Sequence, residues 1–154
     1  MGLDFIIIER GSGVGGTWYW NTYPGIGCDI PSHSYSYSFY RRPSWTLLFS
    51  GGSEIYDYCT EFWHFARLEK YTIFDTEVMK ALWSDEKANW TVTMKNIKTE
   101  KEETETFTFL VSGVGGLHRP SIPNFKDKSR FLGQSWHTTA WPKGLDDQIH
   151  VYNR

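Results

Sequence analysis

The pattern of hydrophobic and polar positions changes its period several times along the chain, and each period predicts a different element. Residues 4–9, DFIIIE, form an apolar run rich in β-branched side chains, which is typical of a buried strand. Residues 34–39, SYSYSF, alternate small polar and aromatic side chains, which predicts a short strand with one ring-covered face. Over residues 53–66 the apolar positions recur every three or four residues, which predicts an amphipathic helix with Ser53 as its N-cap.

Three more strand-like stretches follow the predicted helix and are joined by short polar connections. These stretches are residues 76–83, 90–97 and 105–112. Successive strands with tight polar connections predict an antiparallel meander, in which the charged segment KTEKEET is a solvated hairpin tip. Residues 113–125 are rich in Gly and Pro. Residues 131–144 lack periodicity, which predicts an irregular connector. Residues 148–153 predict one further strand.

Composition and charge narrow the class of protein. The chain has 154 residues, enough for one domain with a core, and 18% of them are aromatic, which suits core packing or a pocket for a flat ligand. The net charge of -2 gives no footprint for a nucleic acid or an anionic membrane, so we expect neither partner. No apolar run approaches the ~20 residues of a membrane span, and no signal segment follows Met1.

The cysteines favour a reducing compartment. Cys28 and Cys59 are the two cysteines, and their separation excludes a disulfide framework and a C-x-x-C site. Together with His33 and His64 they lack the spacing of metal ligands, which argues against zinc. We therefore expect a cytoplasmic protein.

Gly11, Gly13 and Gly16 follow the G-x-G-x-x-G pattern directly after the first predicted strand. In a dinucleotide fold the third glycine opens a helix whose N-terminus holds the pyrophosphate, but TWYWNTYPG has no helical apolar face and contains Pro24. We therefore predict an ordered loop here. A better-fitting alternative places residues 4–9 as the second strand of a dinucleotide fold, in which Glu9 is the strand-end acid that accepts hydrogen bonds from a ribose. The structural alternative is that Glu9 is a solvated residue at the end of a strand.

Two longer stretches carry a family resemblance that covers nearly the whole chain. The segment GVGGTWYWNTYPGIGCDIPSHSYSYSF is similar to the stretch after the second strand of Baeyer–Villiger monooxygenases and related class B flavin monooxygenases. The segment FLGQSWHTTAWP matches the family signature F-x-G-x-x-x-H-T-x-x-W followed by Pro or Asp. The signature residues are Phe131, Gly133, His137, Thr138, Trp141 and Pro142.

The resemblance implies an α/β fold: a partial Rossmann-like FAD-binding domain of the glutathione-reductase type with an antiparallel β-meander. It places the partial FAD-binding domain at residues 1–125, the linker with the signature at 126–147, and the start of a truncated NADPH domain at 148–154. Family members bind FAD, take hydride from NADPH and use O2 to insert oxygen beside a ketone carbonyl or to oxidise a heteroatom. The protein orients the cofactor and excludes water.

The resemblance also implies roles for individual residues. Glu9 would hold the adenosine ribose, Val78 would offer backbone groups to adenine, and Asp29, the catalytic candidate, would help orient an arginine supplied elsewhere in the full-length enzyme. The remaining cofactor-binding candidates are Gly15, Gly16, Thr17 and Trp18 along the flavin side, Tyr35 near the flavin, and His137 in a linker that moves with NADP. The structural alternatives are a loop histidine for His137, a backbone-capping turn residue for Asp29, and core packing for the aromatic rings.

Three departures from the family pattern bear on activity. The opening strand, glycine turn and helix are absent before Met1, the second G-x-G-x-x-G, for NADPH, is expected just after residues 148–153, and Thr22 stands where an arginine is common. One hypothesis is a flavin monooxygenase that is truncated or completed by another polypeptide, and inactive as the isolated chain. The other is a non-catalytic remnant or a small binding module. Loss of the first strand predicts marginal stability and exposed apolar edges.

Overall fold

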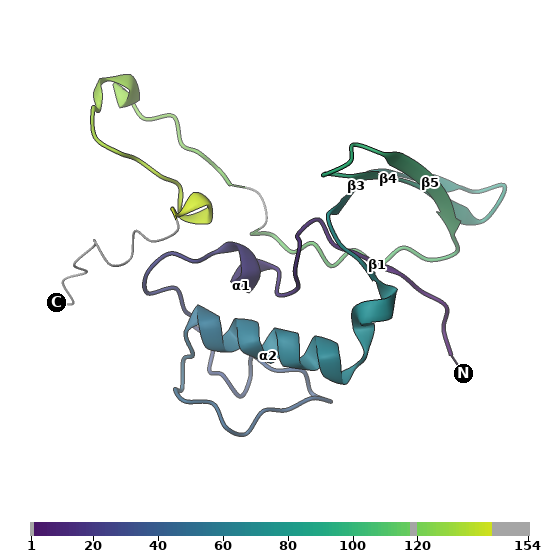
Figure 1. Cartoon of the computed structure of the whole chain (residues 1–154), viewed down its shortest axis with the longest axis horizontal. Coiled ribbons are helices and arrows are strands. Elements are labelled where there is room, and N and C mark those ends of the chain that lie inside the picture. The colour runs from purple at the N-terminus through teal and green to yellow at the C-terminus, as the bar shows by residue number, and fades with distance from the viewer. Residues whose placement is uncertain (1, 118–119, 143–154) are drawn as a thin grey trace. The chain divides into compact units, whose positions relative to one another are not determined.

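The computed structural model describes residues 2–117 and 120–142, which fold into two compact units. The first unit contains residues 2–14 and 60–115, and the second contains residues 15–59 with the described residues from 116 onward. Helices and strands both occur, as the predicted α/β class requires (Figure 1).

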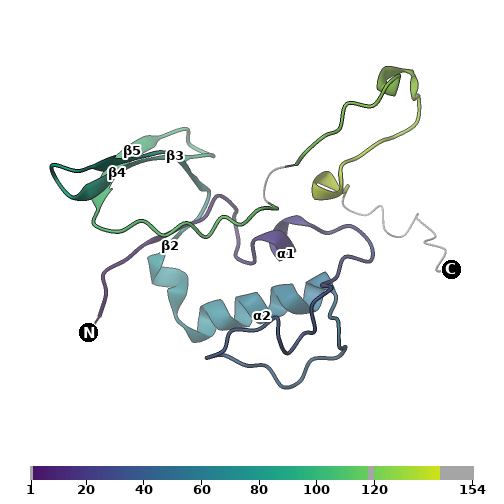
Figure 2. The same ribbon diagram turned by 180° about the vertical axis from the view of Figure 1, so that it is seen from behind.

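The first unit contains a short pair of parallel strands. β1 (Ile7–Ile8) pairs with β2 (Thr72–Ile73), which is labelled in Figure 2. One more ladder bond, 2.9 Å long, joins the Glu9 N–H to the Ile73 carbonyl. The strand predicted over residues 4–9 is therefore shorter than expected, because only its end has a neighbouring strand in the described chain to supply hydrogen bonds.

The predicted antiparallel meander is confirmed in the first unit. Its strands are β3 (Thr76–Ser84), β4 (Asn89–Asn96) and β5 (Glu102–Phe107), in the order β3-β4-β5 (Figure 1). β4 is the central strand, and its side chains at Val92 and Met94 are buried. These two residues are two positions apart, so they lie on one face of the sheet and form the core of the unit.

β5 lies closer to the N-terminus than the predicted strand at residues 105–112. The turn before it explains the shift. The Asn96 side-chain oxygen accepts two backbone N–H groups of the turn, and the Asn96 N–H donates to the Lys101 carbonyl at 2.9 Å. The hairpin therefore closes at Asn96, and acidic residues that were expected at its tip belong to the strand instead.

The long helix begins in the second unit and confirms the helix predicted over residues 53–66. α2 (Gly52–Phe65) buries Ile55 and Tyr58 on one face. The helix starts one residue earlier than expected, so Ser53 lies inside its first turn and the prediction of Ser53 as N-cap is wrong.

Two other predictions for the second unit are wrong. Residues after Gly16 were expected to form a loop without a helix, but α1 (Thr17–Trp20) makes one helical turn. It ends at Asn21, whose extended backbone (φ -100°, ψ 114°) leaves the helix, while its side-chain and backbone N–H groups both donate to the Thr17 carbonyl, at 2.8 and 3.1 Å. Residues 34–39 form turns rather than a strand, since the Tyr37 N–H donates to the Tyr58 hydroxyl instead of to a neighbouring strand.

Short 3-10 turns complete the described elements. They are η1 (Leu68–Tyr71), η2 (Lys128–Arg130) and η3 (Thr138–Ala140). The connector predicted over residues 131–144 is irregular apart from η3 where the structure describes it. The strand predicted at residues 148–153 lies outside the described residues.

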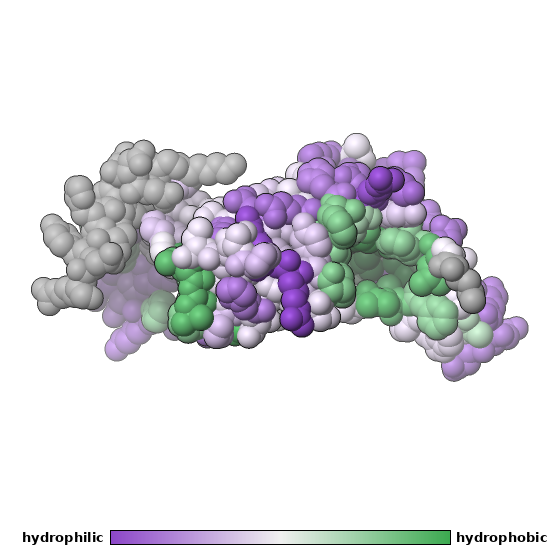
Figure 3. All heavy atoms as spheres, turned by 90° about the horizontal axis from the view of Figure 1, so that it is seen from below, coloured by the Kyte–Doolittle hydropathy of each residue, from purple (hydrophilic) through white to green (hydrophobic). Residues whose placement is uncertain are grey.

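Many large hydrophobic side chains are exposed, as the sequence predicts. Figure 3 shows hydrophobic residues gathered around a hollow on the side of the view that holds the β3–β5 sheet. Among all the described residues, the most exposed large hydrophobic side chains are Leu132 at 97%, Val111 at 90%, Phe109 at 84% and Leu3 at 83%. No helix among the described residues is long and apolar enough to cross a membrane.

Candidate functional site

The residues predicted to bind a cofactor are divided between the two units. Glu9 and Val78 lie in the first unit. The second unit holds the others: Gly15, Gly16, Thr17, Trp18, Asp29, Tyr35 and His137. The local geometry within each unit determines which groups are left available to a ligand.

Glu9 lies at the end of β1, where its side chain is held by the following turn. Its Oε1 atom accepts the Gly11 N–H at 2.6 Å. Its other carboxylate oxygen, Oε2, has no hydrogen-bond partner among the described residues. The carboxylate is thus oriented by the backbone at one oxygen and is free to accept hydroxyl groups at the other.

Val78 lies on β3, an edge strand of the meander. The register of β3 against β4 shifts between Val78 and Lys80, which marks a bulge directly after Val78. Backbone groups on the outer edge of β3 are not used by another strand of this sheet. Backbone N–H and C=O groups at such an edge are available for hydrogen bonds to a partner outside the sheet.

Asp75 is a functional candidate that sequence reasoning missed. Its Oδ1 accepts the Ser12 hydroxyl at 2.5 Å, and its Oδ2 accepts the Lys98 ammonium at 2.6 Å. These bonds, that of Lys98 foremost, hold the pKa of Asp75 below its usual value. Ser12 and Asp75 are 63 positions apart, so no local pattern in the sequence could pair them.

The glycine pair before α1 has a backbone that few other residues could adopt. Gly15 has φ +112°, and a Cβ there would lie 2.8 Å from the Tyr56 ring. Gly16, the N-cap of α1, has φ 52° and ψ -119°, a conformation that favours glycine. The predicted close approach of backbone at this point is therefore possible.

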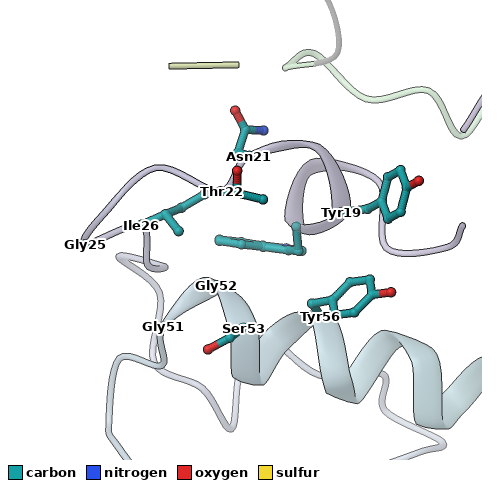
Figure 4. Close-up of a pocket in the computed structure, with 10 residues that line it drawn as sticks. Tyr19, Asn21, Thr22, Gly25, Ile26, Gly51, Gly52, Ser53 and Tyr56 are labelled. Atoms are coloured by element: carbon teal, nitrogen blue, oxygen red, sulfur yellow. The ribbon is translucent and has the colours of Figure 1, made fainter. Parts of the chain in front are cut away.

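A pocket of about 510 Å³ lies in the second unit. Figure 4 shows residues from α1, from the loop after it and from the start of α2 around this pocket. Its lining consists of Trp18, Tyr19, Asn21, Thr22, Gly25, Ile26, Gly51, Gly52, Ser53 and Tyr56. Of the predicted residues, Trp18 alone lines it, and the lining includes Thr22, the position at which an arginine is common in the family.

Trp18 and Tyr35 are brought together, although they are 17 positions apart. The Trp18 indole N–H donates to the Tyr35 hydroxyl at 3.2 Å, and the two rings meet edge to face with centroids 5.8 Å apart. This contact couples the loop around Tyr35 to the wall of the pocket. Both rings were predicted, but their pairing was not.

Asp29 lies in an exposed loop segment between two anchored points. Before it, the Cys28 N–H donates to the Ser50 carbonyl at 3.1 Å. After it, the buried Ser32 hydroxyl accepts the Ser50 N–H at 3.0 Å and lies 2.7 Å from the Ser50 hydroxyl. The Asp29 carboxylate itself has no hydrogen bond or ion pair to any described residue, so it does not cap the turn.

The signature segment owes its geometry to its own residues. The Phe131 ring packs on Gly133, where a Cβ would lie 2.5 Å from the ring. The His137 Nδ1 accepts the Thr139 N–H at 3.2 Å and caps η3. Because Nδ1 is the acceptor, the neutral ring carries its proton on Nε2, which remains a donor.

The two cysteines are unpaired. Burial raises the pKa of the Cys59 thiol above its ordinary value, which keeps it protonated and unreactive. Among the described residues, no group of three His, Cys, Asp or Glu side chains is arranged to hold a metal ion.

Comparison with known proteins gives consistent matches. No family model matches the chain. A Baeyer–Villiger monooxygenase of Pseudomonas aeruginosa is 36% identical over 143 residues, which is 93% of this chain and 26% of that protein. The structure of OTEMO in complex with FAD and NADP is 32% identical, with a TM-score of 0.80, over 94% of this chain and 28% of that one. Cyclohexanone monooxygenase bound to ε-caprolactone is 34% identical, with a TM-score of 0.77, over 90% of this chain and 27% of that one.

These matches define the class first: an α/β protein built like part of a flavin-binding monooxygenase, with an antiparallel meander. The chain is a homologue of the Baeyer–Villiger monooxygenases, as its sequence predicts. It spans about a quarter of the length of the relatives that it matches.

Proposed function

We propose that the chain binds FAD as part of an FAD- and NADPH-dependent monooxygenase of the Baeyer–Villiger type. The observation that carries the proposal is the Glu9 carboxylate, which the Gly11 N–H orients at one oxygen while the other stays available. A carboxylate at the end of a parallel strand accepts ribose hydroxyls in dinucleotide folds. The relatives support this assignment, since OTEMO was solved with FAD and NADP.

The residues present fit the cofactor. We infer that Glu9 holds the adenosine ribose, that Val78 offers backbone groups to adenine, and that the Gly15–Gly16 backbone lies close to the cofactor. Thr17, Trp18 and Tyr35 would complete the flavin side, with Asp29 as the catalytic residue that orients a cation supplied by another part of the enzyme. The uncommitted Asp29 carboxylate and the uncommitted Oε2 of Glu9 support these roles.

When bound, the flavin would accept hydride from NADPH and react with O2. For a ketone the balance is ketone, O2, NADPH and one proton giving ester, water and NADP⁺. One oxygen atom enters the bond beside the carbonyl, the other leaves as water, and NADPH provides the two electrons. A heteroatom substrate takes up the oxygen atom with the same balance. The chain's own part is to bind, orient and shield the cofactor.

We further propose the domain limits implied by the family: residues 1–125 for the partial FAD-binding domain, 126–147 for the linker and 148–154 for the start of the NADPH domain. His137 would respond to NADP through its Nε2 donor. Most of the NADPH site, and the residues that bind substrate, would be supplied by sequence outside this chain or by a complementing polypeptide. The unpaired cysteines support a cytoplasmic location.

Flavin retention tests the proposal directly. The purified chain is mixed with FAD and passed over gel filtration, and the flavin absorbance of the protein peak is recorded. We expect retention by the wild type, and about tenfold or greater weakening by Glu9→Gln, because hydrogen bonds to a charged group are worth ~1.5–3 kcal/mol. Glu86→Gln, which removes an exposed carboxylate from the β3–β4 turn, is the matched control.

No retention by a folded wild-type chain would overturn the proposal. That outcome would favour a non-catalytic remnant or a small binding module, in which the signature residues serve the fold. Retention together with turnover of a ketone or a sulfide, when a separate reductant is added, would extend the proposal from binding to catalysis.

A further inference from the structure

Asp75 joins three segments of the first unit that are distant in sequence. Its backbone N–H donates to the Gly11 carbonyl at 3.0 Å, and its carbonyl accepts the Ile97 N–H at 2.8 Å. Its carboxylate binds the Ser12 hydroxyl on one side and the Lys98 ammonium on the other. Asp75 therefore fastens the turn after β1 and the tip of the β4–β5 hairpin to the start of β3.

The backbone of Asp75 has a left-handed conformation. Its φ is 53°, in the left-handed region that aspartate tolerates better than most residues. This conformation lies between β2 and β3, where the chain turns. The side chain is 17% exposed while that of Lys98 is 64% exposed, so the carboxylate is the shielded member of the pair.

The orientation of Glu9 depends on the same contacts. The Glu9 carbonyl accepts the N–H of Thr76, the residue directly after Asp75, at 3.1 Å. The Gly11 N–H holds the Glu9 carboxylate, and the Gly11 carbonyl accepts the Asp75 N–H. The Asp75 backbone and the Glu9 carboxylate are thus linked through one residue, Gly11.

Lys98 also balances the charge of this turn. Arg10, the basic residue next to Glu9, is paired with Glu77 at 3.4 Å. Lys98 neutralises the Asp75 carboxylate. The negative charges of Asp75 and Glu77 near Glu9 are therefore each paired with a basic side chain.

We propose that Asp75 is a positioning residue for the adenosine end of the nucleotide site, because it fixes Glu9 and Val78 relative to one another. Val78 lies three residues after Asp75 on β3, and Glu9 lies in the turn that Asp75 anchors. The inference rests on the proposed function, which takes Glu9 as the ribose ligand and Val78 as the adenine contact.

The test is Asp75→Asn in the full chain, a variant of almost equal shape that tolerates the same backbone conformation. Dissociation constants of FAD and FMN are measured by flavin fluorescence, because FMN lacks the adenosine end. Amide hydrogen exchange is followed at residues 9–13 without nucleotide. We expect about tenfold weaker FAD binding, as for loss of one charge-assisted hydrogen bond, with unchanged FMN binding and faster exchange at residues 9–13. Glu86→Gln should change none of these.

Equal weakening of FAD and FMN, unchanged FAD affinity, or unchanged exchange at residues 9–13 would overturn the inference. Where FMN alone fails to bind the wild-type chain, the change in FAD affinity and the exchange at residues 9–13 together decide the role of Asp75. Failure of the wild type to bind FAD, with faster exchange in Asp75→Asn, would remove the proposed function and leave the anchoring role of Asp75 in place.

Discussion

The interactions inside the first unit differ in kind from those inside the second unit. In the first unit, β3 and β4 share a long antiparallel ladder, and β4 and β5 share a second one. In the second unit, α2 is preceded by a long irregular segment whose shape depends on side chains that bind backbone groups. A ladder is redundant, because each bond is supported by its neighbours, whereas a loop held by one hydroxyl is not. The difference shows where single substitutions should matter most.

Two residues of the second unit illustrate this dependence. The Ser32 hydroxyl lies within hydrogen-bonding distance of the Leu47 and Leu48 carbonyls, at 2.9 and 3.0 Å, and also accepts the Ser50 N–H. The Tyr58 hydroxyl accepts the Tyr37 N–H at 2.8 Å and donates to the Tyr40 carbonyl at 2.7 Å. Each side chain therefore replaces the neighbouring strand that this part of the chain lacks.

The largest effect is expected where the second unit does have a hydrophobic core. Ile55 is 1% exposed, and Ile55→Ala should lower the free energy of unfolding by about 3 kcal/mol, because it removes buried methyl groups and leaves a cavity. Urea denaturation followed by tryptophan fluorescence measures the change. Met79→Ala, at a side chain that is 54% exposed, should cost less than about 0.5 kcal/mol. A cost below about 1 kcal/mol for Ile55→Ala would mean that polar contacts alone hold the unit.

A smaller effect is expected from a single hydroxyl group. Tyr58→Phe should cost about 2 kcal/mol, because it leaves the Tyr37 N–H and the Tyr40 carbonyl without this partner. Tyr35→Phe is the matched control: it removes an equal group from an exposed bond to Trp18 and should cost about 0.5 kcal/mol. Equal costs for the two variants, measured in the same urea series, would contradict the idea that one hydroxyl organises the loop.

The same difference explains which features could be predicted from the sequence. The meander and α2 follow from local periodicity, which is why they were placed within a few residues of their positions. The strand expected at residues 34–39 failed because its alternating pattern has no neighbouring strand to pair with, and the Tyr58 hydroxyl takes the bond instead. Such a contact between distant residues leaves no local signal.

The candidate site divides in the same way. Glu9 and the glycine pair were recognisable from strand-end and turn chemistry, and the signature around His137 from its spacing. The Asp75 anchor and the pairing of Trp18 with Tyr35 depend on long-range folding, so they became visible only in three dimensions.

The smallest effect on the free energy of unfolding is expected on lowering the pH, and it concerns Asp75 in the first unit. The folded-state pKa of Asp75 lies below its ordinary value of 3.8, so its contribution to stability is complete above that value and is lost as the pH falls through the lowered pKa. Glu54 and Glu69 also have lowered pKa values and act in the same acidic range, so the difference between wild type and Asp75→Asn isolates the contribution of Asp75. Unfolding free energies measured from pH 5 down to about pH 2 should decline less steeply in the variant, and high salt should narrow the gap because Lys98 is exposed. Parallel curves for the two proteins would show that the ladder, rather than the Asp75 carboxylate, holds the turn after β1.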